Sequence, residues 1–225
     1  MKKEYVMIID LNKCVRCRTG YVACKREHNI LAHPRDNEHP YEYYPLRYVE
    51  WEHGKFPNVE RVFIPIHCMH CENPICKNFC PVDAITQTEE GIIQINKDKC
   101  NGCGVCGSIC PYGAIYIGPD GKAGLCDFCI DRLKRGKLPK CVVICPGEAR
   151  IFGDLNDPES KVSKLVASGK AKPLLLQGVK RTRVYYIPSK HEPDFATLPY
   201  DSLFLEALKE RNKDLPPIKG TLYIK

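Results

Sequence analysis

Four groups of cysteines divide the first two thirds of this chain, and their spacing limits what the chain can fold into. The third group is the most regular, a C-x2-C-x2-C-x3-C run followed by proline, at Cys100, Cys103, Cys106, Cys110 and Pro111. In two-cluster ferredoxins, three thiolates of such a run bind one iron–sulfur cluster and the last cysteine binds another. The spacing therefore predicts iron–sulfur ligation.

The other three groups are variations of this pattern. The second has two more residues before its third cysteine, and the fourth has a long insertion between its second and third cysteines. The first has Gly20 where a third cysteine is expected, and no proline follows its last cysteine. The cysteines of these groups are Cys68, Cys71, Cys76 and Cys80; Cys126, Cys129, Cys141 and Cys145; and Cys14, Cys17 and Cys24. All 15 cysteines are thus candidate metal ligands.

Zinc and disulfides are the alternatives for a cysteine-rich chain. C-x2-C pairs also make zinc sites, but zinc needs only four ligands per ion and gives no reason for a further cysteine followed by proline after a triplet. Disulfides are disfavoured because the count of 15 cysteines is odd, the spacings are short for bridges, and no signal peptide is expected at the N-terminus. We therefore expect clusters.

The composition narrows the range of partners. The longest apolar runs, such as 142–144 and 174–176, are far too short to cross a membrane, so we expect no direct membrane span. A net charge of +7 would favour an anionic partner such as nucleic acid. However, each oxidised cluster with its thiolates adds a formal charge of about −2. Four clusters would therefore about cancel the excess, and we expect no nucleic-acid binding.

A short repeat follows three of the groups: proline, two variable residues and alanine come after Cys80, Cys110 and Cys145. It predicts a turn leading out of each cluster loop. Because inorganic cores would replace much of an apolar core, the metal-free chain should barely fold.

Local patterns predict several elements. Strands are expected at 5–9, 91–95 and 183–187, and a short helix between the third and fourth cysteines of a group. A further helix should begin at Pro158 with Asp157 as its cap and end near Gly169. The stretch 200–213 is amphipathic and would dock on the domain or on a partner.

Residues 25–67 lie outside the repeat and are rich in histidine, proline and aromatic residues. They are interpreted either as an interface with a partner or as a loop packed on its own domain. His28, His67 and His70 lie beside cysteines, where they would donate hydrogen bonds to cluster sulfur or be exposed to solvent. The basic loop 132–140 is a solvated face, a counter-charge to the clusters or a docking patch.

A longer run carries a resemblance. Residues 126–132, then Gly136, Pro139, Cys141, Val142, Cys145 and Pro146, closely resemble the iron–sulfur subunits of the molybdopterin oxidoreductases related to dimethyl sulfoxide reductase. Residues 68–74 are similar to the second motif of that family, and residues 153–158 to its segment after the last cluster. The resemblance covers about residues 4–165.

The resemblance implies an α+β fold with two ferredoxin-like halves. The first half would comprise residues 1–24 and 111–155, and the second residues 68–110. Residues 25–67 would be an insertion that forms an interface, and residues 156–225 a C-terminal extension.

The family also implies how the ligands pair. The implied sets are Cys68, Cys71, Cys76 with Cys110; Cys100, Cys103, Cys106 with Cys80; Cys126, Cys129, Cys141 with Cys24; and Cys14, Cys17 with Cys145. The last set lacks a thiolate because Gly20 offers no side chain. Three [4Fe–4S] clusters are expected, with a [3Fe–4S] cluster favoured at the fourth site. The alternatives are a [4Fe–4S] cluster whose fourth iron binds water or a neighbouring oxygen such as that of Thr19, or no cluster.

No catalytic constellation is found: the sequence has no nucleophile elbow, P-loop or dinucleotide fingerprint. The family implies a non-catalytic subunit that passes electrons between a large molybdenum or tungsten pterin subunit and a carrier, which would be soluble or a quinone-linked membrane subunit. A free-standing polyferredoxin and the partner subunit of a transhydroxylase-type enzyme are the alternatives. Such a subunit would be cytoplasmic, or exported with a partner that carries the signal.

Overall fold

The computed structural model describes residues 2–30, 45–176 and 179–189, with the backbone alone at positions 51 and 53. The amphipathic stretch 200–213 and the tyrosines at 41, 43 and 44 lie outside the described residues. Within the described residues, no helix is long and apolar enough to cross a bilayer.

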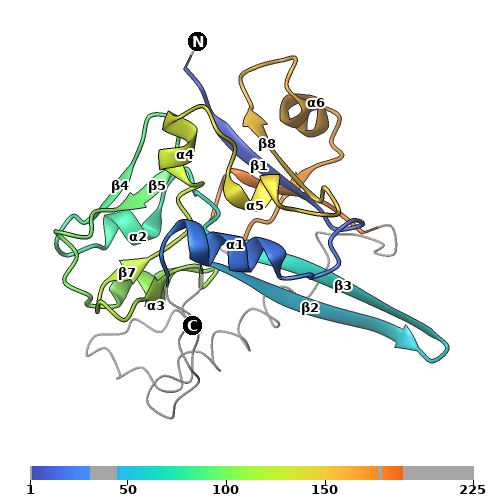
Figure 1. Cartoon of the computed structure of the whole chain (residues 1–225), viewed down its shortest axis with the longest axis horizontal. Coiled ribbons are helices and arrows are strands. Elements are labelled where there is room, and N and C mark those ends of the chain that lie inside the picture. The colour runs from blue at the N-terminus through green and yellow to red at the C-terminus, as the bar shows by residue number, and fades with distance from the viewer. Residues whose placement is uncertain (1, 31–44, 177–178, 190–225) are drawn as a thin grey trace.

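A four-stranded sheet in the order β8-β1-β10-β9 forms one side of the molecule (Figure 1). Its strands are β1 (Tyr5–Asp10), β8 (Arg150–Asp154), β9 (Lys172–Pro173) and β10 (Val184–Ile187). β1 pairs antiparallel with β8 and parallel with β10. The apolar run 6–9 is fully buried because this central strand is covered on both faces. The late strand β10 is therefore in the same sheet as the N-terminal strand β1.

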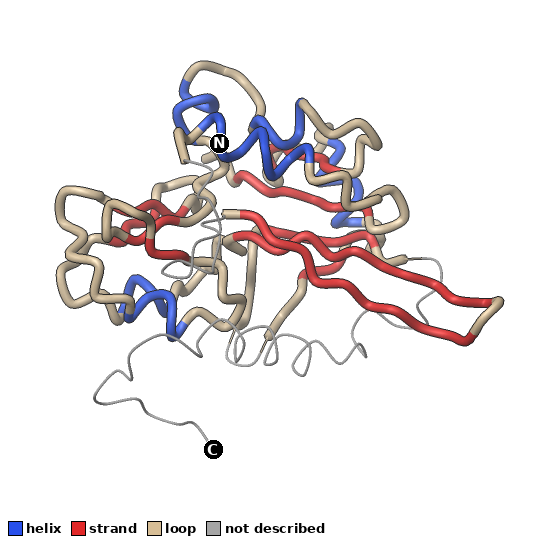
Figure 2. Tube along the Cα trace, turned by 60° about the horizontal axis from the view of Figure 1, so that its bottom comes forward, coloured by secondary structure: helices blue, strands red, loops and turns tan. Residues whose placement is uncertain are grey.

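A long hairpin, β2 (Leu46–Lys55) and β3 (Asn58–His67), projects from the body of the molecule (Figures 1 and 2). Val62, Ile64 and Ile66 alternate along β3 and bury the base of the hairpin in the main core. Phe56, at the tip, is 92% exposed. The projecting end is thus stabilised by pairing between its two strands rather than by packing on the body.

The remaining elements are short. Two small antiparallel sheets pair β4 with β5 and β6 with β7. Their strands and the helices of the described residues are β4 (Ile85–Gln87), β5 (Ile93–Ile95), β6 (Tyr116–Ile117), β7 (Ala123–Gly124), α1 (Thr19–Glu27), α2 (Ile75–Asn78), α3 (Val105–Ile109), α4 (Ile130–Lys134), α5 (Lys140–Val143) and α6 (Lys161–Ala167). Small sheets and short helices of this kind fit the expected α+β class.

The structure confirms the strands expected at 5–9 and 183–187, and α3 is a short helix of the expected kind. The strand expected at 91–95 is shorter, because only Ile93–Ile95 pairs with β4.

The predicted start of α6 is wrong. The helix begins at Lys161, and the Oγ of Ser160 caps it by accepting a hydrogen bond from the Ser163 N–H at 3.1 Å. The Asp157 carboxylate instead accepts from the Glu159 N–H at 2.9 Å and so forms a turn before the helix.

Candidate metal centres

The four C-x2-C loops share one backbone feature. In each loop the residue before the second cysteine has a positive φ: 51° at Arg16, 46° at His70, 72° at Gly102 and 55° at Phe128. Only one of these residues is glycine. Each of the other three has a left-handed backbone conformation that costs about 1 kcal/mol. Strain of this kind is retained where a site requires the geometry.

A second shared feature follows three of the groups. The backbone N–H of Ala84 donates to Cys80 Sγ at 3.3 Å, and Ala114 and Ala149 donate to Cys110 and Cys145 at 3.5 and 3.3 Å. The proline repeat in the sequence thus brings an amide to each sulfur. An amide hydrogen bond stabilises the thiolate form that binds metal.

The chain folds so that cysteines far apart in sequence gather together. Cys68 lies with Cys71, Cys76 and Cys110, and burial followed by repulsion from these neighbours raises the pKa of its thiol well above the usual range. Burial and repulsion from Cys103, Cys100 and Cys80 likewise raise the pKa of Cys106 to about 11. Such thiols remain protonated until a metal displaces the proton.

The other two gatherings lie around α1 and α5. Burial, then repulsion from Cys24, Cys141 and Cys129, raises the pKa of Cys126. Cys14 lies with Cys17 and Cys145, and burial is the main cause of its raised pKa. Cys17 differs because a hydrogen bond with the Thr19 hydroxyl lowers its pKa. All the cysteines are free thiols, without disulfides.

Cavities occur at two of these gatherings. One is lined by Cys80, Cys100, Cys103 and Cys106 together with apolar residues that include Ile85, Ile95 and Ala123. The other is lined by Cys14, Cys17 and Cys145, with Gly20, Tyr48, Arg150 and Cys141 of the neighbouring gathering. Sulfur donors on an apolar wall are the environment that an iron–sulfur core requires. The residues present therefore fit the group.

Gly20 is buried in α1 and lines the cavity of the Cys14, Cys17 and Cys145 gathering, beside Cys141. A β-carbon on it would lie 3.5 Å from Cβ of Cys141, 3.7 Å from Nε of Arg150 and 3.7 Å from Leu46 Cδ2. These are ordinary contact distances, so the position has room for a side chain. The absence of a thiol here is thus not imposed by crowding.

The three histidines differ in their surroundings. His67 and His70 are buried, so the alternative of solvent exposure is wrong for them. His67 Nδ1 lies 2.9 Å from Cys68 O, and His70 Nδ1 accepts from the Ile93 N–H at 3.0 Å. Burial lowers the pKa of His67 to about 3. Both rings are therefore neutral, and these hydrogen bonds involve the backbone rather than sulfur.

His28 is the histidine that contacts a cysteine sulfur. Its Nε2 lies 3.5 Å from Cys129 Sγ and 3.6 Å from Asp127 Oδ1. Asp127 also accepts a hydrogen bond from the Cys129 N–H at 2.8 Å.

The ring of Phe128 packs on His70 with 3.7 Å between the ring centroids. Phe128 therefore separates two gatherings of thiols.

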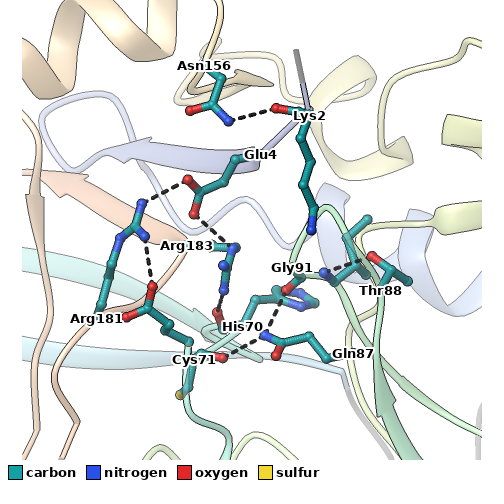
Figure 3. A network of polar contacts seen from close by, with 12 residues as sticks. Lys2, Glu4, His70, Cys71, Gln87, Thr88, Gly91, Asn156, Arg181 and Arg183 are labelled. Carbon is teal, nitrogen blue, oxygen red and sulfur yellow. Dashed lines mark hydrogen bonds and ion pairs between the residues drawn. The ribbon is translucent and has the colours of Figure 1, made fainter.

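An ion-pair network holds the Cys68–Cys71 loop against the N-terminal strand (Figure 3). Glu4 lies between two arginines, 2.8 Å from Arg181 and 3.1 Å from Arg183. Arg181 also pairs with Glu72, and Arg183 donates to the carbonyl of His70 at 3.1 Å. The network joins segments that are far apart in the chain.

In the basic loop, Arg132 pairs with Glu27 at 3.4 Å and donates to Leu138 O, while Lys134 is exposed beside Asp131.

Sequence reasoning missed Arg150, which is buried beside two gatherings of thiols. Its position directly after the proline and alanine repeat was a signal of its closeness to Cys145, although not of its burial.

Comparisons with known proteins agree with this chemistry. The family described as 4Fe-4S dicluster domain matches residues 59–155. One chain of the polysulfide reductase of Wolinella succinogenes is 38% identical, over 84% of this chain and 97% of its own length. One subunit of the sulfite dehydrogenase of Allochromatium vinosum is 35% identical, over 83% and 84% of the two chains. One subunit of the selenate reductase of Mesobacillus selenatarsenatis is 36% identical, over 82% and 72%.

Fold, cysteine pattern and relatives define an iron–sulfur protein of the ferredoxin type. This protein belongs to the family of iron–sulfur subunits of the molybdopterin oxidoreductases related to dimethyl sulfoxide reductase. It is an electron-transfer subunit, and it is not catalytic by itself.

Proposed function

We propose that the chain carries four clusters in a line and passes single electrons along them between a large molybdenum or tungsten pterin subunit and a carrier. The observation that supports this most is the gathering of 15 cysteines into one group of three and three groups of four. We assign the ligands as Cys14, Cys17 and Cys145 for site 1; Cys24, Cys126, Cys129 and Cys141 for site 2; Cys68, Cys71, Cys76 and Cys110 for site 3; and Cys80, Cys100, Cys103 and Cys106 for site 4.

The order of the sites follows from what lies between them. Arg150 adjoins both Cys14 and Cys141, which links site 1 to site 2. Phe128, beside two ligands of site 2, packs on His70, which lies within the loop of site 3. Repulsion from Cys106 contributes to the raised pKa of Cys76, so sites 3 and 4 are adjacent. The line of clusters would thus run from site 1 to site 4.

Site 1 would hold a [3Fe–4S] cluster. Three thiolates are assigned to it, and the Thr19 hydroxyl hydrogen-bonds to Cys17. Cluster type and ligand set are properties that the protein controls. A ferredoxin-like organisation, with residues 1–24 and 111–155 around sites 1 and 2 and residues 68–110 around sites 3 and 4, accompanies this assignment. Residues 25–67 would be the inserted interface and 156–225 the extension.

The catalytic subunit would dock over site 1. Exposed apolar side chains lie close in sequence to residues of this site. Val15 lies between Cys14 and Cys17, Val22 follows Gly20 on α1, and Val143 and Ile144 directly precede Cys145. The hairpin adjoins the same site, because Arg16 forms an ion pair with Glu50 of β2. We therefore propose that the hairpin and this apolar face form one interface, in line with the apolar character of the centre of protein interfaces.

This function is tested by purifying the protein at its natural expression level, together with any partner subunits, and not from cells that overexpress this chain alone. A stable complex with a large molybdenum or tungsten protein is expected, together with reduction of an external carrier when the complex turns over. A protein that purifies alone and shuttles electrons would instead be a free-standing polyferredoxin. A complex that turns over without any external acceptor would be of the transhydroxylase type.

A further inference from the structure

Arg150 is a buried cation placed between two groups of thiols. It is the first residue of β8 and lies opposite Ile9 of β1, directly after the alanine whose N–H donates to Cys145. Only 7% of the residue is exposed. The residues that act on it electrostatically include Cys141, Cys14 and Cys145. It therefore adjoins both site 1 and site 2.

The partners of this guanidinium do not neutralise it. Nη1 lies 3.6 Å from the sulfur of Met7, and a hydrogen bond joins the group to Tyr48. Nη2 is buried without a hydrogen-bond partner, and among the described residues no carboxylate forms an ion pair with Arg150. Burying an isolated charge is costly unless an opposite charge compensates it. Thiolates and a cluster would supply that charge.

We propose that Arg150 sets the reduction potentials of the clusters at sites 1 and 2, by stabilising their reduced states with its fixed positive charge. The inference rests on the proposed cluster sites. Reduction adds one electron and therefore one negative charge to a cluster. A cation held nearby in a medium of low dielectric constant favours that state. No proton moves in this step, because an arginine remains protonated at every working pH.

The position of the guanidinium also bears on Gly20. Its Nε is 3.7 Å from the place that a β-carbon of Gly20 would occupy, on the side of the site where a fourth thiolate is missing. A cation there opposes the binding of a further iron ion by electrostatic repulsion. Arg150 thus favours a three-iron cluster as well as its reduced state.

Redox titration of the purified holoprotein, followed by electron paramagnetic resonance, tests the inference. Arg150→Gln removes the charge, Arg150→Lys keeps it, and Lys164→Gln, which removes an exposed positive charge on α6, is the control. In Arg150→Gln, the ratio of reduced to oxidised cluster at a fixed potential should fall about tenfold at two sites, which corresponds to a shift of about 59 mV to lower potential. The other two potentials should not move, nor should any potential in Lys164→Gln. Arg150→Lys should retain most of the wild-type values, and the shift should not depend on pH.

The outcomes separate this inference from the proposed function. Wild-type protein without iron and sulfide would refute the cluster sites themselves. Clusters that are present but show no shift in Arg150→Gln, or an equal shift at all four sites, would overturn the role of Arg150. Loss of clusters from sites 1 and 2 in both the Gln and the Lys variants would show a structural role and would also overturn it.

Discussion

The α-carbon of Gly20 faces Cys141 across the contact between α1 and α5, so that a β-carbon on Gly20 would lie 3.5 Å from Cβ of Cys141. Gly20 has helical backbone geometry rather than the left-handed geometry that would require glycine. A β-carbon can therefore be added at this position without moving the backbone.

Gly20→Cys should convert site 1 into a four-thiolate site. The oxidised wild-type protein should show a sharp paramagnetic signal near the free-electron value, because three ferric ions leave a net spin. In the variant this signal should vanish and the potential of the site should fall, since an added anionic ligand stabilises the oxidised state.

Gly20→Ala is the matched control, because it adds the β-carbon without the sulfur and should keep the signal. A wild-type protein that lacks the signal but has four complete four-iron clusters would contradict the three-iron assignment. A total of three clusters would show that site 1 is empty.

Docking of the large subunit should depend on the apolar face over site 1 and on the tip of the hairpin. Val22→Asp and Phe56→Asp each place a charge on an exposed apolar residue, and each should weaken the complex by at least about tenfold, or about 1.4 kcal/mol. Pull-down of the large subunit and the visible spectrum of the clusters measure the two effects separately.

The control is Phe79→Asp, because Phe79 is 60% exposed but lies beside Cys80 of site 4. It should leave the complex intact. Deleting residues 41–51 would be a poorer test, since Leu46 and Val49 of β2 are part of the core. Complexes that survive both the Val22 and the Phe56 substitutions would refute the proposed interface.

Two glycines of the Cys100–Cys106 loop provide a further test of site 4. Both have positive φ, 72° at Gly102 and 77° at Gly104, but a β-carbon would lie 1.8 Å from Gly121 O only at Gly102. Gly104→Ala meets nothing within 4 Å and should cost only about 1 kcal/mol of stability. Gly102→Ala should displace the loop and abolish one cluster, as measured by iron per chain. Equal iron contents in the two variants would contradict the assignment of this loop.

The sequence was informative where structure depends on local spacing. The cysteine intervals, the proline and alanine repeat and the strand 5–9 are all local patterns, and the loops and β1 follow them. The hairpin was missed, although Val62, Ile64 and Ile66 alternate as a half-buried strand requires. The many histidines and aromatic residues around this alternation favoured the prediction of an irregular segment instead of two paired strands.

Features that depend on distant segments could not be predicted. The burial of Arg150 requires β8 to pair with β1, and α1 and β2 to cover it, and none of these contacts is encoded near Arg150 itself. His67 and His70 are buried for a similar reason, because Phe128 packs between cysteine loops from remote parts of the chain. The prediction for the cap of α6 was wrong because both Asp157 and Ser160 can cap a helix. Asp157 forms a turn instead, and Ser160 caps the helix.

Metal and sulfide analysis of the anaerobically purified protein tests the central claim most directly. Three [4Fe–4S] clusters and one [3Fe–4S] cluster predict about 15 iron atoms and about 16 acid-labile sulfides per chain, with almost no zinc. Zinc in stoichiometric amounts with little sulfide would contradict the assignment of this protein as a line of iron–sulfur clusters.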